Sequence, residues 1–158
     1  MGAIGRNGRT MRYLFVDKIA DWKAGERIKG VKNVAMTEDF LEFHFPKNPV
    51  MPGVLLIEAF AQLTGWLEAA SSDFKRWFLI TRVRQCKFYG FALPGDQVEM
   101  EVERLPGSTA EQSVYAGIAR VGDKKKVTVE YEGDVIGLDE IEDIEEQKRF
   151  FKLLTRGQ

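Results

Sequence analysis

The chain holds a single histidine, His44, and soon after it one carboxylate, Glu58, interrupts a largely apolar run. A neutral histidine near pH 7 can take a proton, and a carboxylic acid can donate one. This pair of residues therefore predicts general acid–base chemistry. Either residue alone is often structural, since unusual titratable groups mark sites only statistically. Because both lie in one short stretch, the sequence favours a catalytic site.

The segment between these two residues predicts how they are positioned. Three prolines stiffen the loop after His44, and Pro52 suits the first turn of a helix, where its missing N–H would have no partner. From Gly53 to about Ala70 the residues are mostly good helix formers and apolar nearly all the way round, which predicts a buried helix. The unpaired N–H groups at the start of this helix could bind a developing oxyanion.

Glu58 shares its helix face with Val54 and Gln62, which lie one turn before and one turn after it. An ionised carboxylate in apolar surroundings is costly unless it is paired, so burial would favour the protonated, proton-donating form. The alternative is a glutamate at the edge of the helix, exposed or bonded to Gln62. In either case Gln62 is placed to orient the carboxyl group.

This stretch resembles the signature of a known family. The pattern His44-Phe-Pro-x-x-Pro-Val-Met-Pro-Gly53-Val-x-x-x-Glu58-Ala-x-Ala-Gln62 is similar to that of the bacterial (3R)-3-hydroxyacyl-acyl carrier protein (ACP) dehydratases of the Z-type, the hydroxymyristoyl-ACP dehydratases. Further similar stretches are Tyr13-Leu-Phe-Val-Asp17-Lys, Val31-Lys-Asn-Val34, Lys87-Phe and Pro94-Gly95-Asp96-Gln97. The resemblance extends over residues 11–136.

The resemblance implies an α+β hot-dog fold, in which a five- to six-stranded antiparallel sheet wraps a long central helix. It implies dehydration of (3R)-3-hydroxyacyl-ACP to trans-2-enoyl-ACP in fatty-acid biosynthesis, with His44 as base, Glu58 as acid and the Gly53 N–H on the thioester oxygen. Val54 and Gln62 are further substrate-binding positions. No metal and no cofactor beyond the phosphopantetheine of ACP are expected. The family forms homodimers with sites at the interface, often assembled into hexamers.

Two residues depart from the family pattern. Phe43 and Lys47 each stand where glycine is usual. Because ACP is strongly acidic, a basic patch beside the site is also expected. The candidate ACP contacts are Lys47, Arg82, Arg84 and Lys87. Arg82, Arg84 and Lys87 could equally be charged residues on the solvated face of a strand.

Strands are predicted over 12–20, 27–35, 77–88, 97–105, 111–121 and 126–136, with a short helical turn capped by Thr37. From Leu138 onward, apolar residues recur at helical spacing between an acidic start and a basic end, which predicts an amphipathic helix. This helix is interpreted as a packing extension, with docking of a partner protein as the alternative. The expected organisation is a disordered leader over 1–10, a dehydratase domain over 11–137 and a helical extension over 138–158.

The composition limits the classes of protein to which the chain could belong. A chain of 158 residues is one domain in size, and a net charge of −1 gives no general attraction to nucleic acid or membranes. The single cysteine fits a reducing cytoplasm, and no apolar run is long enough to span a membrane. Alternative functions are an acyl-thioester hydrolase, an A-type dehydratase/isomerase, and a non-catalytic acyl-binding or partner subunit of a heteromeric dehydratase. Chain-length preference and pathway stay open.

Overall fold

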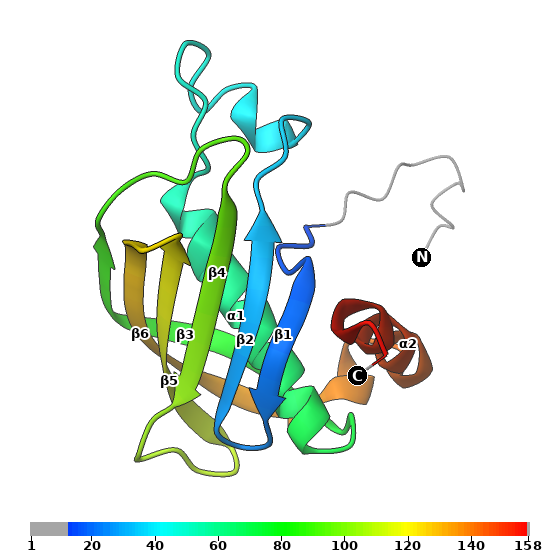
Figure 1. The fold of residues 1–158 in the computed structure, drawn as a ribbon. Coiled ribbons are helices and arrows are strands. Elements are labelled where there is room, and N and C mark those ends of the chain that lie inside the picture. The colour runs from blue at the N-terminus through cyan, green and yellow to red at the C-terminus, as the bar shows by residue number, and fades with distance from the viewer. Residues whose placement is uncertain (1–12, 158) are drawn as a thin grey trace, which may run out of the picture.

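A computed structural model describes residues 13–157, and its core is one sheet wrapped around one long helix (Figure 1). The strands are β1 (Lys18–Lys23), β2 (Arg27–Asn33), β3 (Arg76–Phe88), β4 (Gln97–Arg104), β5 (Gln112–Val121) and β6 (Lys124–Gly137). The helices are α1 (Gly53–Ser71) and α2 (Ile144–Thr155), with single 3₁₀ turns at η1 (Asp39–Leu41) and η2 (Leu138–Glu140). Within 13–157, no helix is long and apolar enough to cross a membrane.

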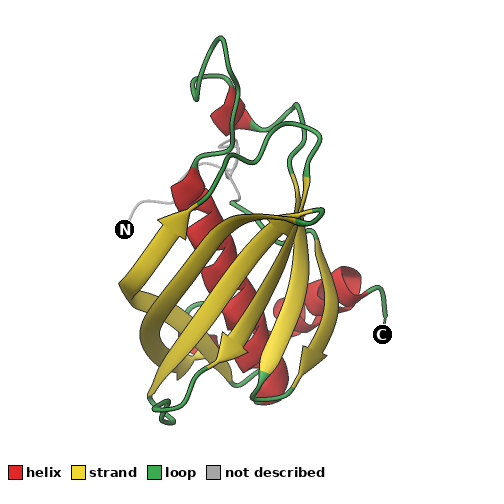
Figure 2. Ribbon diagram, turned by 60° about the vertical axis from the view of Figure 1, so that its left-hand side comes forward, coloured by secondary structure: helices red, strands yellow, loops and turns green. Residues whose placement is uncertain are grey.

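The six strands lie in the order β1-β2-β4-β5-β6-β3, and all neighbours are antiparallel. The sheet curls around α1, as Figure 2 shows, so the predicted hot-dog fold is confirmed. The strands β1 and β3 form its two edges. Because α1 and β3 intervene in the chain between β2 and β4, the pairing of β2 with β4 joins segments that are distant in sequence.

The predicted alternation along β4 is confirmed. Val98, Met100 and Val102 are buried, while the glutamates between them lie on the opposite face. The fully buried Phe60 of α1 packs so closely on β5 that a Cβ at Gly117 would lie 2.7 Å from its ring. Close packing of helix on sheet therefore fixes the position of α1.

A buried polar cluster ties the second half of α1 to the sheet. Tyr115 donates a hydrogen bond to the buried carboxyl group of Glu68, and Arg76 Nη2 lies 3.5 Å from the same group. Burial, and then the neighbouring carboxyl, raise the pKa of Tyr115 far above its usual value, so its hydroxyl stays a donor. Thr64 and Tyr131 share a second buried hydrogen bond of 2.6 Å. These bonds set the depth and rotation of α1 in the sheet.

Two local predictions were wrong. β1 begins at Lys18, because the preceding segment turns its backbone toward Gln62 on α1. The helical turn η1 begins after Glu38 and has no side-chain cap, so Thr37 does not cap it. The predicted leader over 1–10 lies outside the described residues.

The tail forms a shorter helix than predicted, α2, which begins at Ile144. The Asp143 carboxylate accepts a hydrogen bond of 2.9 Å from the Glu146 N–H and caps this helix. The ring of Phe151 packs on Trp22 of β1 and on Trp66 of α1, with ring centroids 6.0 and 5.9 Å apart. The amphipathic character of the tail is confirmed, and its apolar side covers both β1 and α1.

Candidate active site

His44 lies half-buried in the loop between η1 and α1. Its Nδ1 lies 3.0 Å from the carbonyl oxygen of Val50, and the Val50 N–H donates back to the His44 oxygen at 2.8 Å. A carbonyl only accepts, so in the neutral ring this bond holds the proton on Nδ1. Nε2 is then left unprotonated and able to act as a base.

The N-terminus of α1 is anchored next to this loop. The Met51 N–H donates to the Ala92 oxygen at 2.9 Å, and α1 begins two residues later, at Gly53. A Cβ at Gly53 would lie 2.5 Å from the ring of Phe88 on β3, so glycine permits this close approach. The first N–H groups of a helix have no partner within it, and here they follow directly on the histidine loop.

Glu58 and Gln62 are bonded to each other on α1. Gln62 Nε2 donates to Glu58 Oε1 at 3.0 Å and to the Tyr13 oxygen at 2.7 Å, while Gln62 Oε1 accepts from the Phe15 N–H at 2.9 Å. The segment that includes Tyr13 and Phe15 therefore fixes the amide, and the amide orients the carboxyl group. The predicted proximity of the two side chains is confirmed.

The single chain does not bury Glu58. Its side chain is exposed, and Val54, one turn earlier on the same face, is 66% exposed. Of the two alternatives for Glu58, the chain alone has the exposed carboxyl bonded to Gln62. None of the hydrogen bonds within residues 13–157 joins His44 to Glu58. Base and acid are thus held on neighbouring elements without direct contact inside one chain.

The four predicted contacts for an acidic partner differ in their surroundings. Arg82 and Arg84 on β3 both pair with Glu132 of β6, at 3.7 and 2.6 Å. Their charge is therefore partly neutralised. Lys47 is exposed in the histidine loop, and Lys87 lies at the far end of β3.

Sequence reasoning missed a lysine cluster around Tyr89. The ammonium groups of Lys87 and Lys125 lie 5.0 and 5.1 Å from its ring centre, and its N–H donates to the Lys126 oxygen at 2.8 Å. A hydrogen bond with Thr128, and then the two lysine charges, lower the pKa of Tyr89. The lysines at the start of β6 are visible in the sequence. Their proximity to Lys87 of β3 depends on the register of the two strands, which the sequence does not show.

Metal ligands do not gather in the described part of the chain. No group of three or more histidine, cysteine, aspartate or glutamate residues within 13–157 is arranged to hold a metal ion.

Comparison with known proteins identifies the family. The FabA-like domain matches residues 9–132. The 3-hydroxyacyl-(acyl-carrier-protein) dehydratase FabZ of Thermoanaerobacter sp. (strain X514) is 41% identical over 120 residues, which cover 75% of this chain and 83% of that protein. The chain belongs to the FabZ dehydratase family. The FabZ of Geobacter metallireducens is 37% identical over 123 residues, covering 76% of this chain and 80% of that protein.

Solved structures are similar to this FabZ-family chain in fold. The dehydratase heterocomplex ApeI:P from Xenorhabdus doucetiae has a TM-score of 0.57 at 16% identity, covering 72% of this chain and 92% of that one. The smu.793 protein of Streptococcus mutans, bound to acetyl CoA, has a TM-score of 0.60 at 10% identity, covering 85% of this chain and 98% of that one. At these identities the likeness shows the hot-dog fold alone.

The replacement Gln62→Leu tests the amide as the link between Glu58 and the segment around Phe15. It removes the acceptor of the Phe15 N–H, so we expect that amide to exchange its hydrogen about fivefold faster, because one hydrogen bond contributes on the order of 1 kcal/mol. Hydrogen exchange followed by NMR measures this rate.

The matched control is Glu58→Ala, which removes only the carboxyl partner of Gln62. The Phe15 amide should keep its wild-type protection in that variant. Equal exchange of Phe15 in Gln62→Leu and in the wild type would contradict the proposed link.

Proposed function

We propose that this chain removes water from (3R)-3-hydroxyacyl groups carried on acyl carrier protein, giving trans-2-enoyl-ACP in cytoplasmic fatty-acid biosynthesis. The proposal rests on the sequence similarity to FabZ dehydratases over most of the chain. The hydrogen bond between His44 Nδ1 and the Val50 carbonyl supports it, because it leaves Nε2 as a base. The phosphopantetheine of the carrier protein is the only prosthetic group that the reaction requires.

In the proposed mechanism, Nε2 of His44 takes the proton from C2 of the substrate. Negative charge then grows on the thioester oxygen, where the N–H of Gly53 at the start of α1 donates a hydrogen bond. The C3–O bond breaks as Glu58 donates its proton, and the hydroxyl leaves as water. The double bond forms between C2 and C3. The imidazolium and carboxylate that remain return to their starting states by exchanging protons with solvent, and the reverse sequence hydrates the enoyl group.

We further propose that two copies of the chain form a dimer along β3. This strand is an edge of the sheet and exposes Leu79, Val83 and Phe88. The open edge of a sheet presents unpaired N–H and C=O groups that can pair with another chain. The exposed Val54 and Glu58 lie on the uncovered face of α1, and a second subunit would bury them. Each site would then combine His44 of one subunit with Glu58 of the other.

The test of the reaction is turnover of (3R)-3-hydroxybutyryl-ACP, followed by the absorbance of the enoyl thioester. We expect clear dehydration by the wild type. Removing the base in His44→Ala, or the acid in Glu58→Gln, should each lower kcat by roughly 10²-fold or more, because each removes a proton-transfer group.

A matched control for these variants is Glu99→Gln, which neutralises an exposed carboxylate on β4 outside the site. Its turnover should equal that of the wild type. A folded wild-type protein without turnover would point to a non-catalytic acyl-binding or partner subunit. Activity that survives His44→Ala would contradict the proposed base.

The lysine cluster of Lys87, Lys125 and Lys126 around Tyr89 is proposed as the main contact for the acidic carrier protein. It lies at the end of β3 next to Phe88, which packs on the start of α1. Unlike Arg82 and Arg84, none of its lysines forms a salt bridge within the described residues. A concentrated positive charge at this position would attract the carrier and bring the phosphopantetheine arm toward Gly53.

Reversing charge in the double variant Lys87→Glu/Lys125→Glu tests this contact. We expect KM for the ACP substrate to rise by roughly tenfold or more, with kcat nearly unchanged, because rim charges govern encounter rather than chemistry. A short pantetheine thioester lacks the carrier and should react as with the wild type. The control Lys152→Glu, on α2, should leave both parameters unchanged. A rise in KM that is equal for the two substrates would contradict a carrier contact.

A further inference from the structure

A lysine lies on the buried side of β2, where strand alternation calls for an apolar residue. Ile28, Gly30 and Lys32 share one face of this strand, and a Cβ at Gly30 would lie 2.8 Å from the side chain of Leu63 on α1. Lys32 is only 3% exposed, and lysine is almost never so deeply buried unless it is paired with opposite charge. Its stretch is among those that resemble the dehydratase family, yet the proposed reaction gives this residue no role.

Two carboxylates from different segments hold the ammonium group of Lys32. Its Nζ donates to Oε1 of Glu38, which directly precedes η1, at 2.5 Å, and lies 3.4 Å from Oδ2 of Asp17, which directly precedes β1. The same Asp17 oxygen accepts a hydrogen bond of 2.7 Å from the Asn33 N–H. The ring of Phe15 adds a cation–π contact, with its centre 6.0 Å from Nζ. Lys32 thus joins the segment before β1 to the segment before η1.

The bond to Glu38 leads to the proposed base. The backbone oxygen of Glu38 accepts from the Leu41 N–H at 3.1 Å and closes the η1 turn, and the buried side chain of Leu41 anchors this turn in the core. His44 follows three residues later, with its Nδ1 on the Val50 carbonyl. The position of η1 therefore determines where the histidine loop begins.

The contact with Asp17 leads to the proposed acid. The Asp17 N–H donates to the Val31 oxygen at 2.7 Å, which places the segment on β2. Two residues earlier, the Phe15 N–H donates to Gln62, and the amide of Gln62 donates to Glu58. The position of this segment therefore determines how the acid is oriented.

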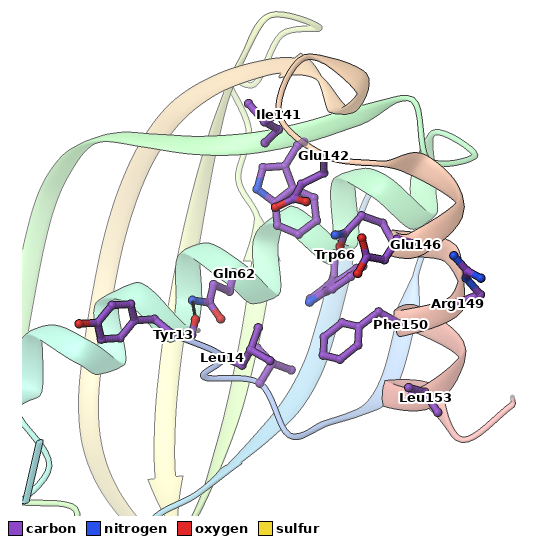
Figure 3. A pocket seen from close by; sticks show the side chains of 13 residues that line it. Tyr13, Leu14, Gln62, Trp66, Ile141, Glu142, Glu146, Arg149, Phe150 and Leu153 are labelled. Atoms are coloured by element: carbon purple, nitrogen blue, oxygen red, sulfur yellow. Dashed lines mark hydrogen bonds between the residues drawn. The ribbon is translucent and has the colours of Figure 1, made fainter. Parts of the chain in front are cut away.

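The segment before β1 is packed on one side only. Phe15 is buried, whereas Tyr13 and Leu14 border a cavity of about 550 Å³ between this segment, α1 and α2 (Figure 3). The open side leaves the segment room to shift. Its position therefore depends on the polar bonds at its two ends, to Gln62 and to Lys32.

We infer that Lys32 is a positioning residue that sets the base and the acid of the reaction together. Through Glu38 it fixes the start of the histidine loop, and through Asp17 it fixes the segment that orients Glu58. A buried apolar residue would fill the same space but could bond neither carboxylate. The inference rests on the proposed function and extends it, because in the proposed dimer the His44 and Glu58 positioned by one lysine serve different sites.

The variant Lys32→Met removes the charge and keeps an unbranched side chain that suits burial. Because His44 is the only histidine of the chain, nitrogen NMR of protein with isotope-labelled histidine reads its tautomer directly. With the ring neutral, the wild type should hold the proton mainly on Nδ1. In Lys32→Met the ratio of this tautomer to the other should fall about fivefold, the factor expected for one lost hydrogen bond. The Phe15 amide should exchange its hydrogen about fivefold faster for the same reason.

The same variant should lower kcat for (3R)-3-hydroxybutyryl-ACP by roughly tenfold or more, because small displacements of catalytic groups slow proton transfer. KM should change by less than about threefold, since the carrier contact is untouched. The matched control is Lys29→Met, which breaks an ion pair with Glu101 on the opposite face of the same strand. It should leave the tautomer ratio, the exchange of Phe15 and kcat at their wild-type values.

Two further variants separate the two contacts, and both keep Lys32 paired with one carboxylate. Glu38→Ala should lower the tautomer ratio of His44 and leave the exchange of the Phe15 amide unchanged. Asp17→Asn should speed the exchange of Phe15 and leave the tautomer ratio unchanged. If Lys32→Met does not fold, these two variants carry the test.

Wild-type values of both readouts in a folded Lys32→Met protein would overturn the inference. Equal disturbance of both readouts in each of the two single-contact variants would also overturn it, because that is the result of general loosening. Neither readout needs turnover. A wild type without dehydratase activity would therefore overturn the proposed function, while the NMR measurements still decide whether Lys32 positions His44 and Glu58.

Discussion

The curved sheet buries α1, and the other elements are placed relative to this helix. Leu56, Phe60 and Leu63 are almost fully buried against the strands. The burial of each side chain stabilises the folded state by about 1.5–3 kcal/mol. A sheet covers only part of a helix. The remaining surface of α1 is covered by the segment before β1 and by α2, and one face is left uncovered. The segment before β1 anchors Gln62, which orients Glu58. Phe151 of α2 packs on Trp66 of α1. The uncovered face is the proposed contact with a second subunit.

Gln62 connects these regions because its amide satisfies three partners at once. It holds Tyr13 and Phe15 against α1 and orients Glu58. A leucine at this position would leave the part-buried N–H of Phe15 without its acceptor, which is costly. Gln62 thus links Glu58 to the segment that precedes β1.

Local features were predictable from the sequence, and features that depend on strand register were not. The start of α1 at Gly53, the bond between Glu58 and Gln62, and the buried side of β4 all follow from short-range spacing. The lysines around Tyr89 lie together only because β6 pairs with β3. The same pairing places Glu132 beside Arg82 and Arg84, whereas Lys87 lies opposite Thr128. The cavity beside α2 could not be predicted because its walls come from three distant segments.

We propose that each reaction centre combines His44 and Glu58 of different subunits. Mixing His44→Ala and Glu58→Gln proteins in equal amounts, with subunit exchange verified by mass spectrometry, tests it most directly. Half of the dimers would then be mixed, and each would hold one intact site of two, so about a quarter of wild-type turnover should return. If both residues of a site came from the same chain, every mixed dimer would have two defective sites. Turnover that stays at the level of the separate variants after complete exchange would therefore contradict a site shared between two subunits.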